Sequence, residues 1–253
     1  MHDSVSRHLA LTGACNFRDL GGYPGAQGRP VRWRQLFRSN HLGLLTDTDI
    51  AQIRALGVKT AFDLRGVSER LPTLCCVEDI AVHSLPIEPA IYGALTSHVA
   101  SGKPLTADDA AEMMRDSYRD YVRHNTPAFR QLMTHLLEDH APLVIHCTAG
   151  KDRTGFACAM VLSALGVAHE LVVTDYLLTN QFYRLDPVTD KSIPLPDDIK
   201  AVLVSVETSF LDAAFAAVRE DFGDLENYLA DGLGVGPSER RELHARYLDR
   251  EIT

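Results

Sequence analysis

The chain has 253 residues, 45% of them hydrophobic, and a formal net charge of −9. This length allows one sizeable domain, and the acidic balance argues against nucleic-acid binding and against a surface attracted to anionic membranes. The longest apolar run, residues 156–165, is too short to span a bilayer, so we expect no membrane insertion. Residues 1–11 lack the apolar core of a signal peptide, and the five cysteines have no metal-like spacing. These features favour a cytoplasmic, reducing location, although export without a leader would leave no mark on the sequence.

Short strands and one capped helix are predicted near the start of the chain. Glycines and prolines punctuate residues 14–38, which indicates turns between short strands, the second of them over residues 32–38. Thr46 has the position of a helix N-cap, and Gly57 follows the last apolar turn of that helix. A strand is predicted next, over residues 58–64. A helix followed by a strand is the alternation expected of an α/β sheet.

The middle of the chain is predicted to carry an insert. A further strand is expected over residues 82–85, whereas residues 86–110 contain prolines, glycines and few large apolar side chains, which indicates a loop or mobile insert. Helical periodicity follows over residues 111–123. We therefore predict that residues 86–123 form a lid or insert within a single domain that spans residues 1–253.

The predicted helix after the insert has Met114, Tyr118 and Tyr121 on one face. Met and Tyr side chains at helical spacing are more typical of a core than of a substrate clamp, and we interpret this stripe as core. Thr126 is predicted to cap the next helix, with Pro127 at its first position. The apolar faces of both helices are expected to face inward.

The local pattern is clearest around residues 143–166. Residues 143–145 are a β-branched-rich apolar run, which is typical of a buried strand. Thr154 opens an apolar helix that ends before Gly166. The remaining chain is predicted to be helical, with a proline-bearing loop over residues 180–196 and helices over residues 171–178, 199–222, 225–229 and 238–248. No second group of strands follows, so the predicted class is α/β, with a central sheet and helices on both faces.

A strand, a tight loop and a helix N-terminus in this order make an anion site. Backbone N–H groups of such a loop converge on one point, and the helix dipole adds positive potential there. Cys147 begins the loop, and Arg153 lies six positions later. An electropositive pocket favours the nucleophilic thiolate, and a planar guanidinium can hold two phosphate oxygens. The loop therefore has the parts for attack by sulfur on phosphorus, and we expect it to bind phosphate or sulfate.

The residues of this loop also carry a family resemblance. The pattern His-Cys-x5-Arg-Thr resembles the phosphate loop (P-loop) of the cysteine-dependent protein-tyrosine and dual-specificity phosphatases. The likeness is greatest to their atypical bacterial branch and rests on the run His-Cys-Thr-Ala-Gly-Lys-Asp-Arg-Thr-Gly at 146–155 and on segments 16–22, 37–39 and 62–65 with Glu69. The resemblance implies a protein-tyrosine-phosphatase-like fold with a helical insert. It also implies a hydrolase that acts on phosphoproteins, through phosphotyrosine or phosphoserine/threonine, or on phosphoinositides, without metal or cofactor.

Each residue of the loop has an expected role. Cys147 is the proposed nucleophile that forms a phosphocysteine, and Arg153 is expected to bind the phosphoryl group and stabilise its charge. The Thr154 hydroxyl is expected to hydrogen-bond the Cys147 sulfur, and His146 is expected to support the loop structurally. The phosphate cradle is completed by the backbone amides of Thr148, Ala149, Gly150, Lys151 and Asp152.

The general acid is a carboxyl group, and two are candidates. The resemblance implies Asp152, whose alternative role is to shape the loop by accepting backbone hydrogen bonds. Asp63 is the second candidate, because it ends a predicted strand and strand ends lie near ligands in open α/β sheets. The alternative is that Asp63 and Arg65 form a structural ion pair with Glu69 or Arg70. The resemblance links Lys151 with phosphoinositide substrates, and the alternative is that Lys151 strengthens the anion field.

Other classes of protein share parts of this pattern. Gly150 and Lys151 look like the Gly-Lys pair of a nucleotide-binding loop, but Asp152 stands where Ser or Thr would bind magnesium, and Ile145 stands where the first glycine belongs. A sulfurtransferase-like enzyme also uses a cysteine in a strand–loop–helix cradle. A catalytically weak phospho-binding module is the third alternative. Arg153 and the His-Cys-x5-Arg-Thr run favour phosphate over sulfur transfer. A binding module would normally lack the cysteine or the arginine, and both are present here. The oligomeric state stays open.

Overall fold

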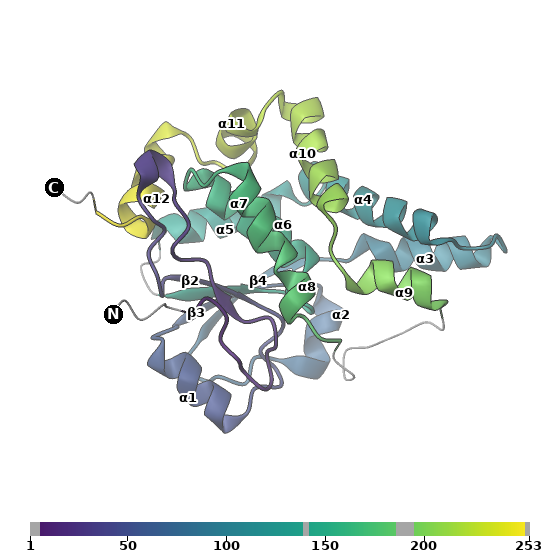
Figure 1. Cartoon of the computed structure of the whole chain (residues 1–253), viewed down its shortest axis with the longest axis horizontal. Helices are drawn as coiled ribbons and strands as arrows, with labels where there is room; N and C mark the ends of the chain where they lie inside the picture. Colours follow the sequence, from purple (N-terminus) through teal and green to yellow (C-terminus); the bar gives the residue numbers. More distant parts are fainter. Residues whose placement is uncertain (1–5, 139–141, 186–194, 251–253) are drawn as a thin grey trace.

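The computed structural model describes residues 6–138, 142–185 and 195–250 (Figure 1). Its centre is a five-stranded sheet in the order β1-β2-β5-β3-β4. β1 runs antiparallel to β2, and the other neighbouring strands are parallel. The strands span Arg18–Asp19 (β1), Leu36–Ser39 (β2), Thr60–Arg65 (β3), Ala81–Ile87 (β4) and Leu143–His146 (β5). The predicted α/β class is confirmed.

β5 lies in the middle of the sheet, between β2 and β3. All four of its residues are buried, as expected of a β-branched apolar run in a parallel sheet. The register places His146 level with Ser39 on one side and with Asp63 on the other. Because parallel strands end at the same edge of a sheet, the segments that follow β2, β3 and β5 lie side by side there. The site forms at this edge.

One face of the sheet is covered by α1, which spans Asp47–Ala55. Thr46 caps this helix as predicted: its hydroxyl accepts a hydrogen bond from the Asp49 amide at 3.2 Å, and the Asp49 carboxylate accepts one from the Thr46 amide at 2.9 Å. A small core lies between helix and sheet and includes Phe17, Phe37, Ile53, Ala61 and Val144.

The opposite face carries the larger core and most of the helices (Figure 1). α6 leads away from β5, and nearly all of its side chains are buried, so its sequence is apolar on every side rather than along one stripe. Met114, Tyr118 and Tyr121 belong to this core, as the sequence indicates. The helices of this layer are α4 (Ala107–Arg123), α5 (Thr126–Glu138), α6 (Asp152–Ala164), α7 (His169–Leu177), α10 (Thr208–Phe222) and α12 (Pro237–Tyr247).

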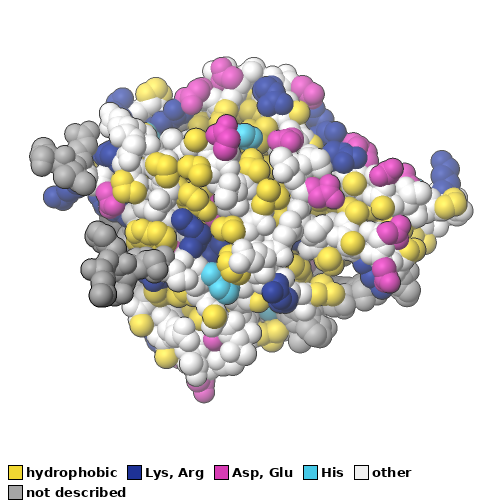
Figure 2. Space-filling model, in the orientation of Figure 1, with side chains coloured by type: hydrophobic (Ala, Val, Ile, Leu, Met, Phe, Trp, Pro, Cys, Tyr) yellow, Lys and Arg dark blue, Asp and Glu magenta, His cyan; other side chains and the backbone are white. Residues whose placement is uncertain are grey.

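The described residues contain several shorter helical segments. They are α2 (Val67–Arg70), α3 (Ala90–Ala100), α8 (Thr179–Phe182), α9 (Asp197–Val204), α11 (Leu225–Asn227), the 3₁₀ turns η1 (Ala26–Gly28) and η2 (Leu71–Thr73) and the π turn η3 (Tyr228–Gly232). Figure 2 shows acidic and basic side chains interspersed over the helical part of the face in view. Among the helices described, none is by itself long and apolar enough to cross a membrane; α9 and α10 meet that test only as a bent pair.

The predicted loop over residues 86–110 is wrong for most of its length. β4 continues to Ile87, α3 fills Ala90–Ala100, and α4 begins at Ala107 with Thr106 as its N-cap. α3 packs against α4 and buries Leu95, while other apolar side chains on α3 stay exposed. Contact with α4 therefore supports a helix whose own periodicity is weak.

The single long helix predicted over residues 199–222 is also wrong. The chain forms α9 and α10 instead, bent by 55° at a break over residues 205–207. Groups from distant segments bond the backbone at this break. The Lys151 ammonium donates to the carbonyls of Leu203 and Ser205, and the Asn180 side chain bonds both the N–H and the C=O of Val206 at 2.8 Å. These tertiary hydrogen bonds replace those of a continuous helix.

Candidate active site

The loop over residues 147–151 turns sharply between β5 and α6. Cys147 stands at the end of β5 with 2% of its surface exposed, and α6 begins at Asp152. Gly150 has φ +66°, and a Cβ on it would lie 2.2 Å from the Ser39 carbonyl oxygen at the end of β2. Both the backbone conformation and the close approach therefore require glycine at this position.

The carbonyl groups of residues 148–150 are all held from outside the loop. The His41 amide donates to the first of them at 3.2 Å. The Asn16 side-chain amide donates to the second carbonyl, that of Ala149, at 3.3 Å and to the third, that of Gly150, at 3.0 Å. The Arg38 guanidinium also donates to this third carbonyl, at 2.9 Å. Because the N–H and C=O of a peptide point in opposite directions, these bonds turn the loop amides toward its concave side, as an anion site requires.

A buried ion-pair cluster supports these donors. Asp175 on α7 accepts from Arg38 at 2.8 Å and lies 3.5 Å from Arg18 Nε, and both arginines are fully buried. Arg18 in turn donates to the side-chain oxygen of Asn16. Burial acts to raise the pKa of Asp175, but the charges of Arg18 and Arg38 outweigh it and lower the pKa. The family-like segments 16–22 and 37–39 therefore support the phosphate loop from behind. Asp175 is a residue that the sequence analysis missed.

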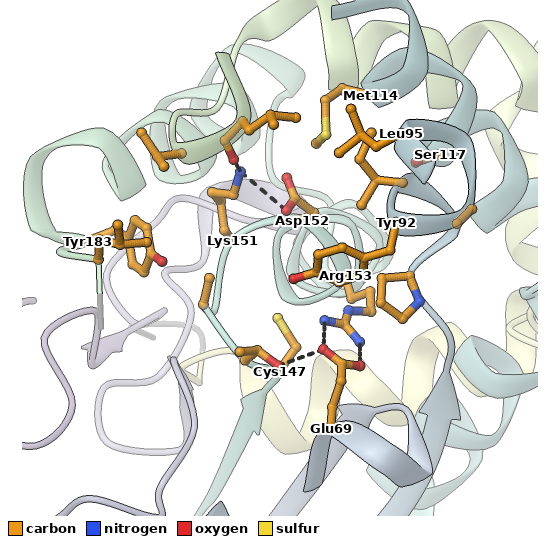
Figure 3. Close-up of a pocket in the computed structure, with 18 of the residues that line it drawn as sticks. Glu69, Tyr92, Leu95, Met114, Ser117, Cys147, Lys151, Asp152, Arg153 and Tyr183 are labelled. Carbon is orange, nitrogen blue, oxygen red and sulfur yellow. Dashed lines mark hydrogen bonds and ion pairs between the residues drawn. The ribbon is translucent and has the colours of Figure 1, made fainter. Parts of the chain in front are cut away.

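Arg153 presents one free edge of its guanidinium to the cavity. Its Nη1 and Nη2 donate to the two oxygens of Glu69, at 2.6 and 2.9 Å, and Nη1 also donates to the Ile87 carbonyl at 3.0 Å. Nε and the second proton of Nη2 have no acceptor within the described residues. Burial opposes the charge of Arg153, but nearby Cys147 and Glu69 raise its pKa above the ordinary value, so the guanidinium stays charged. Figure 3 shows this guanidinium beside the Cys147 sulfur.

Glu69 on α2 is the second residue whose role the sequence analysis missed. Besides Arg153, its carboxylate accepts hydrogen bonds from the Thr148 hydroxyl at 2.8 Å and from the Gly66 amide at 2.9 Å. Burial acts to raise the pKa of Glu69, but the hydrogen bonds and charge of Arg153 lower it. Glu69 thus fixes the edge of Arg153 that carries Nη1 and Nη2, and the edge with Nε stays free. The resemblance of residues 62–65 with Glu69 to the phosphatase family was the sequence signal from which this role could have been found.

Asp152 and Lys151 lie on the other side of the cavity (Figure 3). Asp152 Oδ1 accepts a hydrogen bond from the Tyr118 hydroxyl at 3.0 Å, and Oδ2 lies 3.4 Å from Lys151 Nζ. The Lys151 ammonium donates to the carbonyls of Leu203 at 2.6 Å and Ser205 at 2.9 Å. The carboxyl group of Asp152 therefore borders the cavity, while the lysine is turned toward the C-terminal end of α9.

Three residues expected in the site lie outside the cavity. Asp63 is buried and accepts hydrogen bonds from Arg65 Nε at 2.9 Å and Nη2 at 2.8 Å, so its ion-pair partner is Arg65 rather than Arg70. His146 is fully buried, and burial lowers its pKa to about 4, which keeps the ring neutral. The buried Thr154 hydroxyl has no hydrogen-bond partner among the described residues, so the expected bond to the Cys147 sulfur is not formed in this structure.

The cavity has a volume of about 440 Å³, and most of its charged groups lie on one wall, with Lys200 of α9 as the exception. That wall is the phosphate loop with Glu69, and the opposite walls come from α3, α4 and α9. The apolar and aromatic side chains of these walls include Ile91, Tyr92, Leu95, Met114, Tyr121, Tyr183 and Leu203. A site of this size, with apolar walls and a few convergent polar groups, is typical of small-molecule and side-chain binding. No group of three or more His, Cys, Asp or Glu side chains in the described ranges is placed to hold a metal ion.

The cavity brings together the parts of one reaction type. A cysteine lies at its base, a guanidinium edge and a helix N-terminus converge beside the sulfur, and a carboxyl group borders the same space. This combination defines a cysteine-dependent phosphatase, in which sulfur attacks a phosphoryl group held by the loop.

Comparison with known proteins agrees with this class. The chain belongs to the tyrosine phosphatase family, whose model matches residues 9–249. It is 33% identical to a Cupriavidus necator protein with the provisional name tyrosine-protein phosphatase, over 93% of this chain and 88% of the relative. It is 32% identical to the triple specificity protein phosphatase PtpB of Mycobacterium tuberculosis, over 87% and 92%. It is 26% identical to a tyrosine-protein phosphatase of Nostoc commune, over 88% and 77%.

We predict that Asp175→Asn destabilises the protein strongly at neutral pH. The substitution leaves two buried arginines without their counter-charge, which in comparable cases removes about 3–5 kcal/mol. The pKa of Asp175 is lowered by folding, so its contribution is complete above about pH 4 and is lost as the pH falls through the folded-state pKa. Denaturant unfolding of the wild type and of Asp175→Asn between about pH 7 and pH 3 measures the effect. The difference between their free energies of unfolding should become smaller in acid.

The matched control is Asp212→Asn, because Asp212 is exposed on α10. Its free energy of unfolding should follow that of the wild type at every pH. The role of Asp175 as counter-charge would be contradicted if its substitution lowered the free energy of unfolding equally at every pH. It would also be contradicted if the loss were no larger than that for Asp212→Asn.

Proposed function

We propose that this chain hydrolyses phosphotyrosine in two steps through a phosphocysteine on Cys147. The observation that carries the proposal is that the Cys147 sulfur and the free edge of Arg153 face one cavity at the N-terminus of α6. Family membership supports the same reaction. The apolar walls suit an aromatic ring, and a nucleophile at the base of a cavity favours a long, rigid phosphorylated side chain such as phosphotyrosine.

In the first step the Cys147 thiolate attacks phosphorus and the bond to the leaving oxygen breaks. The free Nε and Nη2 protons of Arg153 and the loop amides hold the non-bridging oxygens as their charge develops. Asp152 gives its proton to the leaving phenolate oxygen. In the second step Asp152 takes a proton from water, which attacks phosphorus, so the P–S bond breaks and inorganic phosphate and the thiolate are released. Asp63 lies outside the cavity and has no part in this scheme.

The purified chain is expected to release phosphate from a phosphotyrosine peptide without added metal. Cys147→Ser should lower the rate by about 10³-fold or more, because a serine hydroxyl is not ionised in this pocket. The variant should still bind orthovanadate or phosphate, since the loop amides and Arg153 are unchanged. Retained turnover in Cys147→Ser would reject the mechanism, and release of thiocyanate from thiosulfate and cyanide in place of phosphate would indicate a sulfurtransferase.

Asp152→Asn is expected to affect substrates according to their leaving groups. A phenol of high pKa needs a proton as it departs, whereas 4-nitrophenolate departs without one, so the loss should be about 10²-fold on phenyl phosphate and much smaller on 4-nitrophenyl phosphate. Steady-state turnover on the two esters measures the effect. Equal losses on both would remove Asp152 from the role of acid.

Phosphoinositides are a second class of substrate that we propose for the same site. One relative is named a triple specificity phosphatase, and Lys151 adds a cation beside the loop. In the structure its ammonium is bound to the carbonyls of Leu203 and Ser205. A second phosphate group on an inositol ring would compete with these carbonyls for the ammonium.

Lys151→Met is expected to impair multiply phosphorylated inositides more than phosphotyrosine, by about tenfold in relative kcat/KM, because one charge-assisted contact is lost. Lys103→Met, at an exposed lysine on the turn between α3 and α4, is the matched control and should change neither substrate. Parallel losses on both substrates would show that Lys151 supports the wall of the cavity rather than lipid recognition.

Two further expectations complete the proposed function. Residues 86–123 supply α3 and α4, which form one wall of the cavity, and we propose that this segment is a lid whose moving part is α3, because α4 is packed into the core. We also propose that the enzyme works in the cytoplasm, because a catalytic thiolate persists in a reducing compartment.

A further inference from the structure

Two buried tyrosines from different helices meet behind Asp152. Tyr118 comes from α4 and Tyr176 from α7, and both are at most 1% exposed. Their hydroxyl oxygens lie 2.6 Å apart, and the Tyr118 hydroxyl donates to Asp152 Oδ1 at 3.0 Å. The pair is built closely into the start of α6, since a Cβ on Gly155 would lie 2.9 Å from the ring of Tyr176. Gly155, the last residue of the motif at 146–155, thus makes room for the ring of Tyr176.

The number of hydroxyl protons sets the direction of these hydrogen bonds. Each tyrosine has one hydroxyl proton, and the proton of Tyr118 is used toward Asp152. Tyr176 must therefore donate to Tyr118, which gives a chain from Tyr176 through Tyr118 to Asp152. Burial raises the pKa of both tyrosines well above the usual 10, so both remain donors at neutral pH.

This chain of donors acts on a carboxyl group that could otherwise turn toward the start of its own helix. Asp152 stands in the first turn of α6, where a carboxylate is attracted by the free backbone amides and the helix dipole. The bond from Tyr118 holds Oδ1 away from those amides. With Oδ1 occupied by the bond from Tyr118, Oδ2, which lies 3.4 Å from Lys151 Nζ, is the oxygen left to exchange a proton with the substrate.

We propose that Tyr118, supported by Tyr176, is a positioning residue for the general acid: it holds Oδ1 of Asp152 so that Oδ2 delivers the proton to the leaving oxygen. The proposal deepens the proposed function and rests on the role assigned there to Asp152. It differs from a packing role for these tyrosines, because it requires the hydroxyl groups and not only the rings.

The test measures turnover on aryl phosphates whose leaving phenols range from 4-nitrophenol to phenol. Tyr118→Phe keeps the ring and removes the hydrogen bond to Asp152, so we expect about a tenfold loss on phenyl phosphate and less than about twofold on 4-nitrophenyl phosphate, a weaker form of the effect of removing the acid. Tyr176→Phe should show the same trend at about two- to threefold. Binding of orthovanadate should be unchanged in both variants, because the loop and Arg153 are intact.

The matched control is Tyr228→Phe, which removes another buried hydroxyl, bonded to Thr126 at 2.9 Å and outside the cavity. Loss of a buried hydrogen bond should lower its stability as in Tyr118→Phe without any dependence on the leaving group. Equal losses of Tyr118→Phe on all esters, or no loss, would overturn the proposal even if Asp152→Asn depends on the leaving group. If Asp152→Asn itself shows no such dependence, the acid lies elsewhere and the proposed function fails at that step. Should Tyr118→Phe fail to fold, a flat leaving-group profile of Tyr176→Phe would overturn the proposal.

Discussion

The capture of the loop carbonyls from outside is the interaction on which the site depends. A loop that binds a dianion must point several amides at one place, and its carbonyl groups must then find donors behind it. Asn16 and Arg38 supply these donors, and Asp175 holds Arg38 in place from α7. The proposed anion site is therefore held by buried charges that lie behind the loop and outside the cavity. This explains why segments 16–22 and 37–39 resemble the family although they lie behind the loop and not in the cavity.

The two cations of the loop are both paired before substrate arrives, and the pairings differ in kind. Glu69 binds the Nη1–Nη2 edge of Arg153 and leaves the edge with Nε open. Lys151 is bound to backbone carbonyls at the end of α9 and lies 3.4 Å from Asp152. In the proposed reaction Arg153 can bind a phosphoryl group without changing its partners, whereas Lys151 must exchange partners to contact a second phosphate group. The proposed site would therefore bind one phosphate first.

Local patterns were sufficient to predict the reactive part of the chain. The β-branched run before Cys147, the glycine at 150 and the apolar helix after it each depend on neighbours in sequence, so strand, loop and helix follow from them. The capping signal at Thr46 worked for the same reason. Weak periodicity failed at α3, which is helical because it packs on α4, and at the break between α9 and α10, where distant side chains bond the backbone.

By itself the sequence predicted the α/β class, which the structure confirms, and proposed Cys147 as nucleophile and Arg153 as phosphate ligand, because these proposals depend on residue chemistry and on spacing within one short segment. The tertiary structure alone decided the partners of those residues. Asp175 lies 137 residues from Arg38, and Arg153 lies 84 residues from Glu69, separations at which no local pattern reports contact. Asp63 and Asp152 looked alike as candidate acids in the sequence. In the structure Asp63 is buried on β3 and bonded to Arg65, whereas Asp152 at the start of α6 borders the cavity and accepts a hydrogen bond from Tyr118.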